Sequence, residues 1–267
     1  AADDRRRLAW IRQHQAGVAF LSGDTELAEE RLAVSSGLFE DLGDRSGAGW
    51  AMGLLAYVRF FERRFSDAEA LATTVRGDAA ELGELWAPAM MDSLMASIRL
   101  WTGRFSDAEE LSRRALSGFR ELNDRFGIVQ ALAPRMRALV ALGRNQEAER
   151  SLEEALSLAD AFGDLAIPTV AAAGTAAHLG LGARAVALSE VALSRMLAMH
   201  ADGSEARITL ALGLCQVGDS EGALATLLDV STPRPYSRAV TAVAAAMSGM
   251  ADEALVEADL VMNDDTS

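Results

Sequence analysis

The 267-residue sequence has no lysine, a single cysteine, only five prolines and few aromatic residues, at 6%. With Cys215 alone, an internal disulfide framework and a thiolate metal cage are both excluded, and we expect a cytoplasmic protein. Valine and isoleucine are too sparse for a set of buried strands. Alanine and leucine dominate the 50% of hydrophobic residues, which favours helices packed closely through small side chains. We therefore expect an all-α protein.

Basic charge and long apolar runs are also scarce. The 25 basic residues, all arginine, stand against 39 acidic ones, giving a net charge of −14. A nucleic-acid-binding surface needs a dense basic face, so we expect no direct contact with nucleic acid. No apolar run approaches the roughly 20 residues of a membrane span, so we expect no membrane contact. The arginine-only, alanine-rich composition is typical of a G+C-rich bacterial genome. Because the chain starts without methionine and stops in a polar tail, we expect a piece of a longer protein.

Patterns of catalytic and metal-binding residues are missing as well. His14, His178 and His200 have no partner histidine at metal-ligand spacing, so we expect ordinary structural roles for them. The segment 180–185 superficially matches a dinucleotide-binding fingerprint, but it follows a helix rather than a strand, which removes the physical basis of that motif. We expect no enzyme activity, no cofactor and no bound metal.

The sequence does contain an internal repeat of 40 residues. Arg-Phe-Ser-Asp-Ala-Glu occurs at 64–69 and again at 104–109, and a second marker keeps the same register at 42–45, 82–85, 122–125 and 162–165. A small residue in the second helix marks seven repeats, at Ala28, Ala68, Ala108, Ala148, Ala185, Ala223 and Ala254. We expect one domain over 1–267, with repeats at about 5–43, 44–83, 84–123, 124–163, 164–200, 201–231 and 235–262.

Each repeat is expected to form a helix, a tight turn and a second helix. The first helices are expected near 5–21, 46–62, 86–102, 126–142, 165–179, 203–217 and 236–248. The second are expected near 24–42, 66–83, 106–122, 145–162, 183–199, 220–230 and 251–262. Glycine at the turn suits a left-handed residue, and Arg63 is the single exception.

Several local features refine this picture. Ser66 with Glu69, and Ser106 with Glu109, predict capping boxes at helix starts. Pro134 predicts a kink in the middle of a helix. The segment 232–235, with two prolines, predicts a linker before the last repeat. Acidic pairs that recur on the second helices predict a solvated outer face, and these pairs are Glu29-Glu30, Glu109-Glu110 and Glu153-Glu154.

These features resemble the tetratricopeptide repeat. Its small residue midway through the first helix corresponds to Ala16, Ala56, Ala96, Ala173, Ala211 and Ala242, with Met136 as the departure. The usual Trp and Tyr of that helix are not at their places, so the resemblance is to a long-repeat branch, as in the helical region of actinobacterial ATPase-linked transcriptional regulators. The resemblance implies a right-handed α-α superhelical solenoid of about seven helix pairs. It also implies a non-catalytic protein–protein interaction scaffold within a larger bacterial regulator.

In such solenoids the first helices line the concave face, which is the usual binding surface. Carrying the family's groove positions over, together with two arginines 40 residues apart, gives nine candidate groove residues: Trp10, Gln13, Trp50, Tyr57, Arg59, Phe61, Arg99, Trp101 and Arg137. Aromatic side chains would anchor a ligand, and arginines would hold a carboxylate or phosphate. The alternative is that the aromatics only pack the solenoid and that Arg59 and Arg99 pair with Glu62, Asp92 or Glu69.

Three functional hypotheses follow. The first is a protein or peptide partner in the groove, including other domains of the parent chain. The second is a small-molecule effector held by the aromatic groove of the first three repeats. The third is a homodimer through the last repeat, because its second helix, with Leu255 and Leu260 among its apolar residues, has no capping helix after it. The alternative is that the missing cap results from truncation of the chain.

Overall fold

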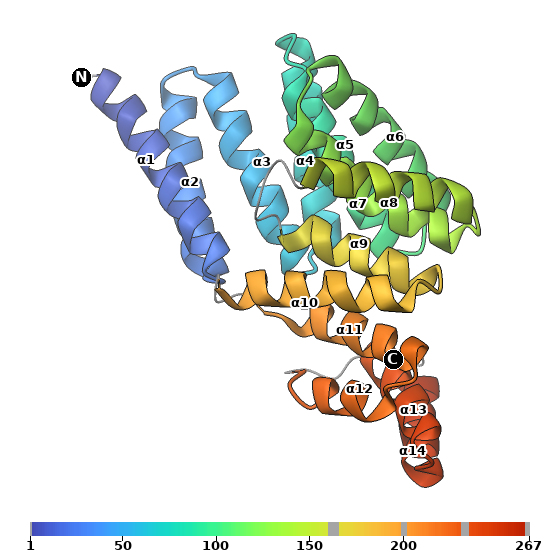
Figure 1. The fold of residues 1–267 in the computed structure, drawn as a ribbon. Coiled ribbons are helices and arrows are strands. Elements are labelled where there is room, and N and C mark those ends of the chain that lie inside the picture. The colour runs from blue at the N-terminus through green and yellow to red at the C-terminus, as the bar shows by residue number, and fades with distance from the viewer. Residues whose placement is uncertain (1, 160–165, 199–201, 231–234, 265–267) are drawn as a thin grey trace. The chain divides into compact units, whose positions relative to one another are not determined.

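A computed structural model of the chain describes residues 2–159, 166–198, 202–230 and 235–264, which form fourteen α-helices and no strand. The first helices of successive pairs are α1 (Ala2–Leu21), α3 (Arg45–Phe61), α5 (Trp86–Trp101), α7 (Arg125–Ala141), α9 (Ala166–His178), α11 (Ser204–Val217) and α13 (Pro235–Met247) (Figure 1). The second helices are α2 (Thr25–Asp41), α4 (Phe65–Glu81), α6 (Phe105–Glu121), α8 (Asn145–Ala159), α10 (Gly182–Ala198), α12 (Ser220–Leu227) and α14 (Ala251–Asp264). The all-α helical repeat is confirmed, with every helix end within three residues of the prediction.

The helices form two compact units, Ala1–Leu142 with α1 to α7 and Gly143–Ser267 with α8 to α14. Within the N-terminal unit each helix contacts the next, and the first helices also touch in succession, α1 with α3, α3 with α5 and α5 with α7. In the C-terminal unit α9 contacts α11, and α11 contacts α13. Contact between neighbouring first helices is the stacking of a helical repeat array.

The seven repeat boundaries and the single domain over 1–267 stay predictions. The marker at 162–165 and most of the predicted linker at 232–235 lie outside the described residues, as does His200.

Both kinds of turn depend on a left-handed residue. Inside the helix pairs the expected glycines have positive φ angles, such as 83° at Gly23 and 74° at Gly103. Arg63 stands at the same place in the second repeat and adopts the same backbone, with a φ of 63°. Between pairs the left-handed residue is Gly43, Gly83 or Asn123. Glycine, and to a lesser extent asparagine, adopts this conformation at low cost, so these positions end the helices.

Aspartates, and not the predicted capping boxes, cap several helix starts. The side chain of Asp44 accepts a hydrogen bond from the Gly47 N–H at 3.0 Å, and Asp24, Asp124 and Asp219 cap their helices in the same way. Helices α4 and α6 instead begin one residue before the predicted serines, with an arginine at the N-cap and no side-chain cap bond. Both capping boxes are therefore wrong. Arg64 pairs with Asp67 and Arg104 with Asp107, so these acidic groups stabilise the first turn without capping it.

At two repeat junctions of the N-terminal unit, a large buried side chain packs against a glycine of the next helix. Phe39 and Phe119 are fully buried near the ends of their second helices. Each ring lies against a glycine of the next first helix, since a Cβ added to Gly47 or Gly127 would come within 2.4 or 2.1 Å of it. In the junction between them, the corresponding residues are Ala79 and Ala87, so this junction has neither the ring nor the glycine.

Helix α7 continues through Pro134, which cannot donate to the carbonyl of Gln130 four residues earlier. The hydroxyl of Ser93 on α5 donates to that carbonyl at 3.3 Å. A side chain from the neighbouring repeat thus replaces the lost backbone bond.

Candidate functional site

All nine candidate groove residues lie on the first helices of the N-terminal unit. They do not form one continuous surface along each helix. Trp50 is near the start of α3 and Phe61 is its last residue, so their Cα atoms are about 16 Å apart along the axis at the rise of an α-helix. The exposed aromatics therefore gather near the two ends of the first helices.

Near the starts of α3 and α5, Trp50 stacks on Trp86. The ring centroids are 4.7 Å apart with planes inclined by 21°, and Trp50 remains 41% exposed. The Trp86 indole N–H donates to the Asp124 carboxylate at 2.6 Å, which fixes the inner ring of the stack. Trp86 lies one helical turn before Met90, the residue equivalent to Trp50 in the next repeat, so the groove positions do not include it. The signal that could have identified it is its 36-residue spacing from Trp50, one turn short of the repeat.

Near the ends of α3 and α5 lie two further exposed aromatics. Phe61 is 49% exposed and meets the edge of Phe20 at a centroid distance of 5.2 Å. Trp101 is 44% exposed, and the guanidinium carbon of Arg63 lies 5.5 Å from its ring centroid. This is a cation–π contact. Arg63 was not among the candidates, although it is the only non-glycine residue in the turn series.

The packing alternative holds for Trp10. It is half-buried and meets Phe39 edge-on, with centroids 5.1 Å apart. Gln13, one turn further along α1, is also half-buried, and its side-chain oxygen has no hydrogen-bond partner among the described residues. Arg137 lies half-buried on α7.

The ion-pair alternative is confirmed for both candidate arginines. Arg59 pairs with Glu29 on the preceding second helix and with Glu62 at 3.2 Å. Arg99 makes two hydrogen bonds to Glu69 on α4, one of them at 2.7 Å, and these bonds lower the pKa of the Glu69 carboxyl. Neither guanidinium is left unpaired to receive an anion.

The same contact recurs at the next junction, where Arg135 on α7 approaches Glu109 on α6 at 3.6 Å. Glu29 and Glu109 therefore face the following first helix, and placing them on a solvated outer face was wrong. Asp92, proposed as an alternative partner, is buried between Arg76 at 2.8 Å and Arg114 at 2.6 Å. Several charged residues of the N-terminal unit thus join neighbouring repeats.

Tyr57 is held between repeats as well. Its hydroxyl donates to the Met90 carbonyl on α5 at 3.5 Å, and burial raises the pKa of the phenol well above its usual range. The phenol stays neutral and acts as a spacer and hydrogen-bond donor, not as an acid or base.

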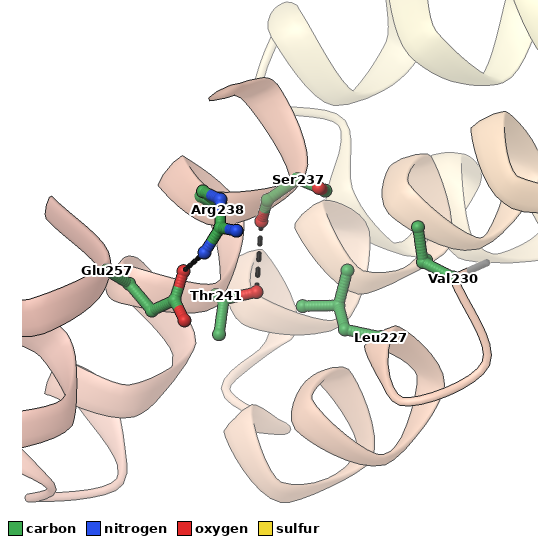
Figure 2. A pocket seen from close by; sticks show the side chains of 6 residues that line it. All are labelled: Leu227, Val230, Ser237, Arg238, Thr241 and Glu257. Carbon is green, nitrogen blue, oxygen red and sulfur yellow. Dashed lines mark hydrogen bonds and ion pairs between the residues drawn. The ribbon is translucent and has the colours of Figure 1, made fainter. Parts of the chain in front are cut away.

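Two hollows among the described residues lie away from the candidate groove residues. In the N-terminal unit, a hollow of about 330 Å³ is lined by α2, α3 and one residue of α4, and it includes none of the nine candidates. In the C-terminal unit, the lining of a pocket of about 90 Å³ includes Arg238 and Glu257, which form an ion pair of 3.1 Å, and Thr241, whose hydroxyl donates to the Ser237 carbonyl at 3.0 Å (Figure 2). Small-molecule sites typically occupy about 300–1,000 Å³, so only the first approaches a ligand site in size.

The described residues offer no constellation for chemistry. No group of three or more His, Cys, Asp or Glu is placed among them to hold a metal ion. His14 and His178 each have Nδ1 2.7 Å from a carbonyl of their own helix. Cys215 is buried, and burial raises the pKa of its thiol. Across these residues, no helix is both long and apolar enough to cross a membrane.

The fold is shared with solved structures of tetratricopeptide repeat proteins. The Rap protein complexed with competence and sporulation factor aligns with a TM-score of 0.72 at 13% identity, over 96% of this chain and 74% of that one. A tetratricopeptide repeat protein from Parabacteroides merdae aligns with a TM-score of 0.54 at 13% identity, over 96% of this chain and 93% of that one. The third structure is a signal transduction ATPase with numerous domains from Pyrococcus horikoshii, which has a tetratricopeptide repeat sensor. It aligns with a TM-score of 0.60 at 17% identity, over 94% of this chain but 41% of that one.

No protein-family model and no curated protein matches the sequence. At these identities the structural likeness establishes the fold and not the activity.

Proposed function

We propose that the protein is a non-catalytic scaffold that binds a polypeptide segment on the N-terminal unit. The observation that carries this proposal is the exposure of three large aromatic side chains, Trp50, Phe61 and Trp101, on α3 and α5, where the other large residues are packed or ion-paired. Exposed aromatics anchor partners well, because they bury a large area while losing few rotamers.

The side chains around these anchors indicate what the segment carries. Arg63 lies over Trp101 and makes no ion pair that the structure describes, whereas Arg59 and Arg99 are already paired with glutamates. A segment with an apolar or aromatic side chain and a nearby carboxylate would contact Trp101 and Arg63 together. A guanidinium held above an indole can still donate hydrogen bonds from its edge.

The solved relatives support a regulatory setting. One is a complex of Rap with competence and sporulation factor, and another is an ATPase whose repeats are described as a sensor. By analogy, this chain would be the interaction module of a larger bacterial regulator in the cytoplasm.

The test starts from the partner itself. Cross-linking or pull-down with the other domains of the parent protein should capture one partner segment, whose affinity is then measured by calorimetry. Trp101→Ala and Trp50→Ala should each weaken that binding by at least about tenfold, which is about 1.4 kcal/mol. Val34→Ala on α2, an equally exposed apolar residue away from these anchors, should leave the affinity unchanged.

Two results would overturn the proposal. One is that no polypeptide partner binds while a small molecule raises the melting temperature. The other is that the tryptophan variants lose stability and not affinity, which would make the aromatics packing residues.

The second candidate function is a sensor for a small effector. The hollow of about 330 Å³ beside α2 and α3 favours it, because its size falls at the lower end of small-molecule sites. A metabolite screen by thermal shift would identify the effector, and Gly37→Leu on the lining of this hollow should then abolish the shift. An effector that instead quenches Trp50 or Trp101 would place the site on the exposed aromatics.

A further inference from the structure

The hollow of about 330 Å³ beside α2 and α3 combines an apolar lining with a single charged side chain. Leu32 and Ala51 are its most buried lining residues, and Glu40 is the one charged residue among the described residues that line it. The Glu40 carboxylate accepts a hydrogen bond from the Ser36 hydroxyl at 3.1 Å. It is exposed and makes no ion pair that the structure describes. The hollow thus offers an apolar surface beside a carboxylate that has no basic partner among the described residues.

The next repeat shows what occupies the equivalent place there. Moving 40 residues along the chain replaces Ser36 by Arg76 and Met52 by Asp92. The Arg76 Nε lies 2.8 Å from the buried Asp92 carboxylate, so the arginine side chain crosses from α4 to α5. An arginine of the chain itself therefore spans the place that lies open in the preceding repeat.

The last helix pair has a similar arrangement. Counted from the small residue of the first helix and the marker alanine of the second, Arg238 on α13 corresponds to Met52, and Glu257 on α14 corresponds to Leu71. The two side chains form an ion pair of 3.1 Å in the lining of the pocket of about 90 Å³ (Figure 2). Of these three equivalent places, two contain an arginine paired with an acidic residue, and the third is open beside Glu40.

The open place suits the same side chain. Arginine packs its aliphatic stem on apolar surface while its charged head stays near water. The half-buried Met52, Leu55 and Leu71 would contact the stem, and Glu40 would accept hydrogen bonds from the guanidinium. The net charge of −14 would also favour the approach of a basic segment.

We infer that this hollow binds an arginine side chain of the partner polypeptide, as the chain's own arginines fill the equivalent places in two other repeats. The inference rests on the proposed function, because it requires a polypeptide partner. It adds a second contact, on α2, α3 and α4, to the exposed aromatic anchors of the N-terminal unit. Glu40 would then select partners that carry an arginine at the matching place.

Methyl NMR of the 267-residue chain, labelled at its methionine methyl groups, tests this inference. The probe is N-acetyl-arginine N-methylamide, and Met52→Leu assigns the signal of Met52, which lines the hollow. The probe should shift this signal to saturation, and the citrulline analogue, which has nearly the same shape without the charge, should bind at least about threefold more weakly. Glu40→Gln should weaken binding of the arginine probe by the same factor. Glu26→Gln, which removes another exposed carboxylate of α2 outside the lining, is the matched control and should bind normally.

Two variants fill the hollow in different ways. Gly37→Leu adds a side chain at a helical position where a Cβ would meet no atom within 4 Å, so the chain should fold normally and lose the probe. Ser36→Arg supplies an arginine from the chain itself, as at position 76, and should also prevent the probe from shifting the Met52 signal. Unchanged probe binding in both variants would place the probe outside the hollow and overturn the inference.

This inference and the proposed function fail in different ways. If the arginine probe leaves the Met52 signal unchanged, or binds no more tightly than the citrulline analogue, the inference is overturned while binding at the exposed aromatics stands. When a partner segment has been captured, replacing its bound arginine by citrulline should weaken it at least about threefold. A segment that keeps its affinity at every such replacement overturns the inference alone. Capture of no polypeptide overturns the proposed function, and probe binding would then assign the hollow to a small guanidinium compound instead.

Discussion

At the junction of α6 and α7, the Phe119 ring leaves no room for even a methyl group on Gly127. The phenylalanine ring is fully buried and fills the space that a side chain at Gly127 would need. The Gly127 N–H also donates a hydrogen bond to one carboxylate oxygen of Asp124, the N-cap residue of α7. The other carboxylate oxygen accepts a hydrogen bond from the Trp86 indole N–H. One aspartate therefore fixes a helix start and the inner ring of an exposed stack.

We expect Gly127→Ala to lower the free energy of unfolding by about 1–3 kcal/mol, because the new methyl group overlaps the Phe119 ring. Urea unfolding followed by tryptophan fluorescence measures this change. Gly77→Ala on α4 is the matched control of opposite sign. It has open space around it and an ordinary helical backbone, so it should raise the free energy of unfolding by about 0.5–1 kcal/mol. Equal effects at the two sites would contradict the overlap argument.

At the scale of helices, ion pairs join the second helix of one repeat to the first helix of the next. Glutamates one residue after the marker alanine pair with arginines of the next first helix, as in Glu69 with Arg99. Because Arg99 donates two hydrogen bonds to the ionised carboxylate, the pKa of Glu69 is lower in the folded chain than in the unfolded one. The contribution of the pair to stability is therefore complete above the unfolded pKa of about 4.3 and is lost as the pH falls through the folded pKa.

Glu69→Gln should therefore destabilise the chain at pH 7, and the difference from the unaltered protein should shrink on acidification. We expect at most about 1 kcal/mol at pH 7, because the glutamate is partly exposed and its interaction is screened by solvent. Urea unfolding at about pH 7 and about pH 3.5 measures both values. Glu30→Gln, on an exposed side chain of α2, is the control and should change little at either pH. A difference that grows in acid would contradict the assigned direction of the pKa shift.

The helices were predictable from the sequence because the repeat carries them redundantly. Left-handed glycines, marker alanines and apolar periodicity all specify the same boundaries, so one departure such as Arg63 does not disturb the pattern. The side-chain contacts were less accessible. Trp50 on α3 stacks on Trp86, which lies on α5 one helical turn before the residue equivalent to Trp50. The repeat register compares only equivalent positions, so it does not predict this contact. The outer face predicted for Glu29 is wrong because adjacent residues on a helix lie on different faces. Glu30, the next residue, is exposed, whereas Glu29 is half-buried.

For the whole molecule, the distribution of tryptophan makes the two compact units separately observable. Trp10, Trp50, Trp86 and Trp101 all lie in the N-terminal unit, whereas both units contain helices. Tryptophan fluorescence therefore follows unfolding of the N-terminal unit, and far-UV circular dichroism follows both. In repeat proteins each element is stabilised mainly by its nearest neighbours, so damage in one unit should stay local.

Gly213→Val on α11 tests this locality. The added side chain would overlap Val186 and Ala185 of α10, which lie 3.1 and 3.2 Å from the position of a Cβ. We expect the circular dichroism transition to broaden toward lower urea concentration while the fluorescence midpoint stays unchanged. Gly127→Ala is the reciprocal variant and should shift the fluorescence midpoint. Parallel shifts of both signals for Gly213→Val would show that the chain unfolds as one cooperative body.

The identical hexapeptide at 64–69 and 104–109 also has a consequence for the gene. If replication slips between the two copies, residues 64–103 are removed and Arg-Phe-Ser-Asp-Ala-Glu remains once, without any new sequence at the joint. Helix α3 would then be followed directly by α6, with the glutamate–arginine contacts of the outer junctions retained. The same event in reverse adds a repeat. We expect natural variants of this gene to differ in length by multiples of 120 nucleotides, so that the number of exposed aromatic anchors can change while each remaining junction keeps its packing.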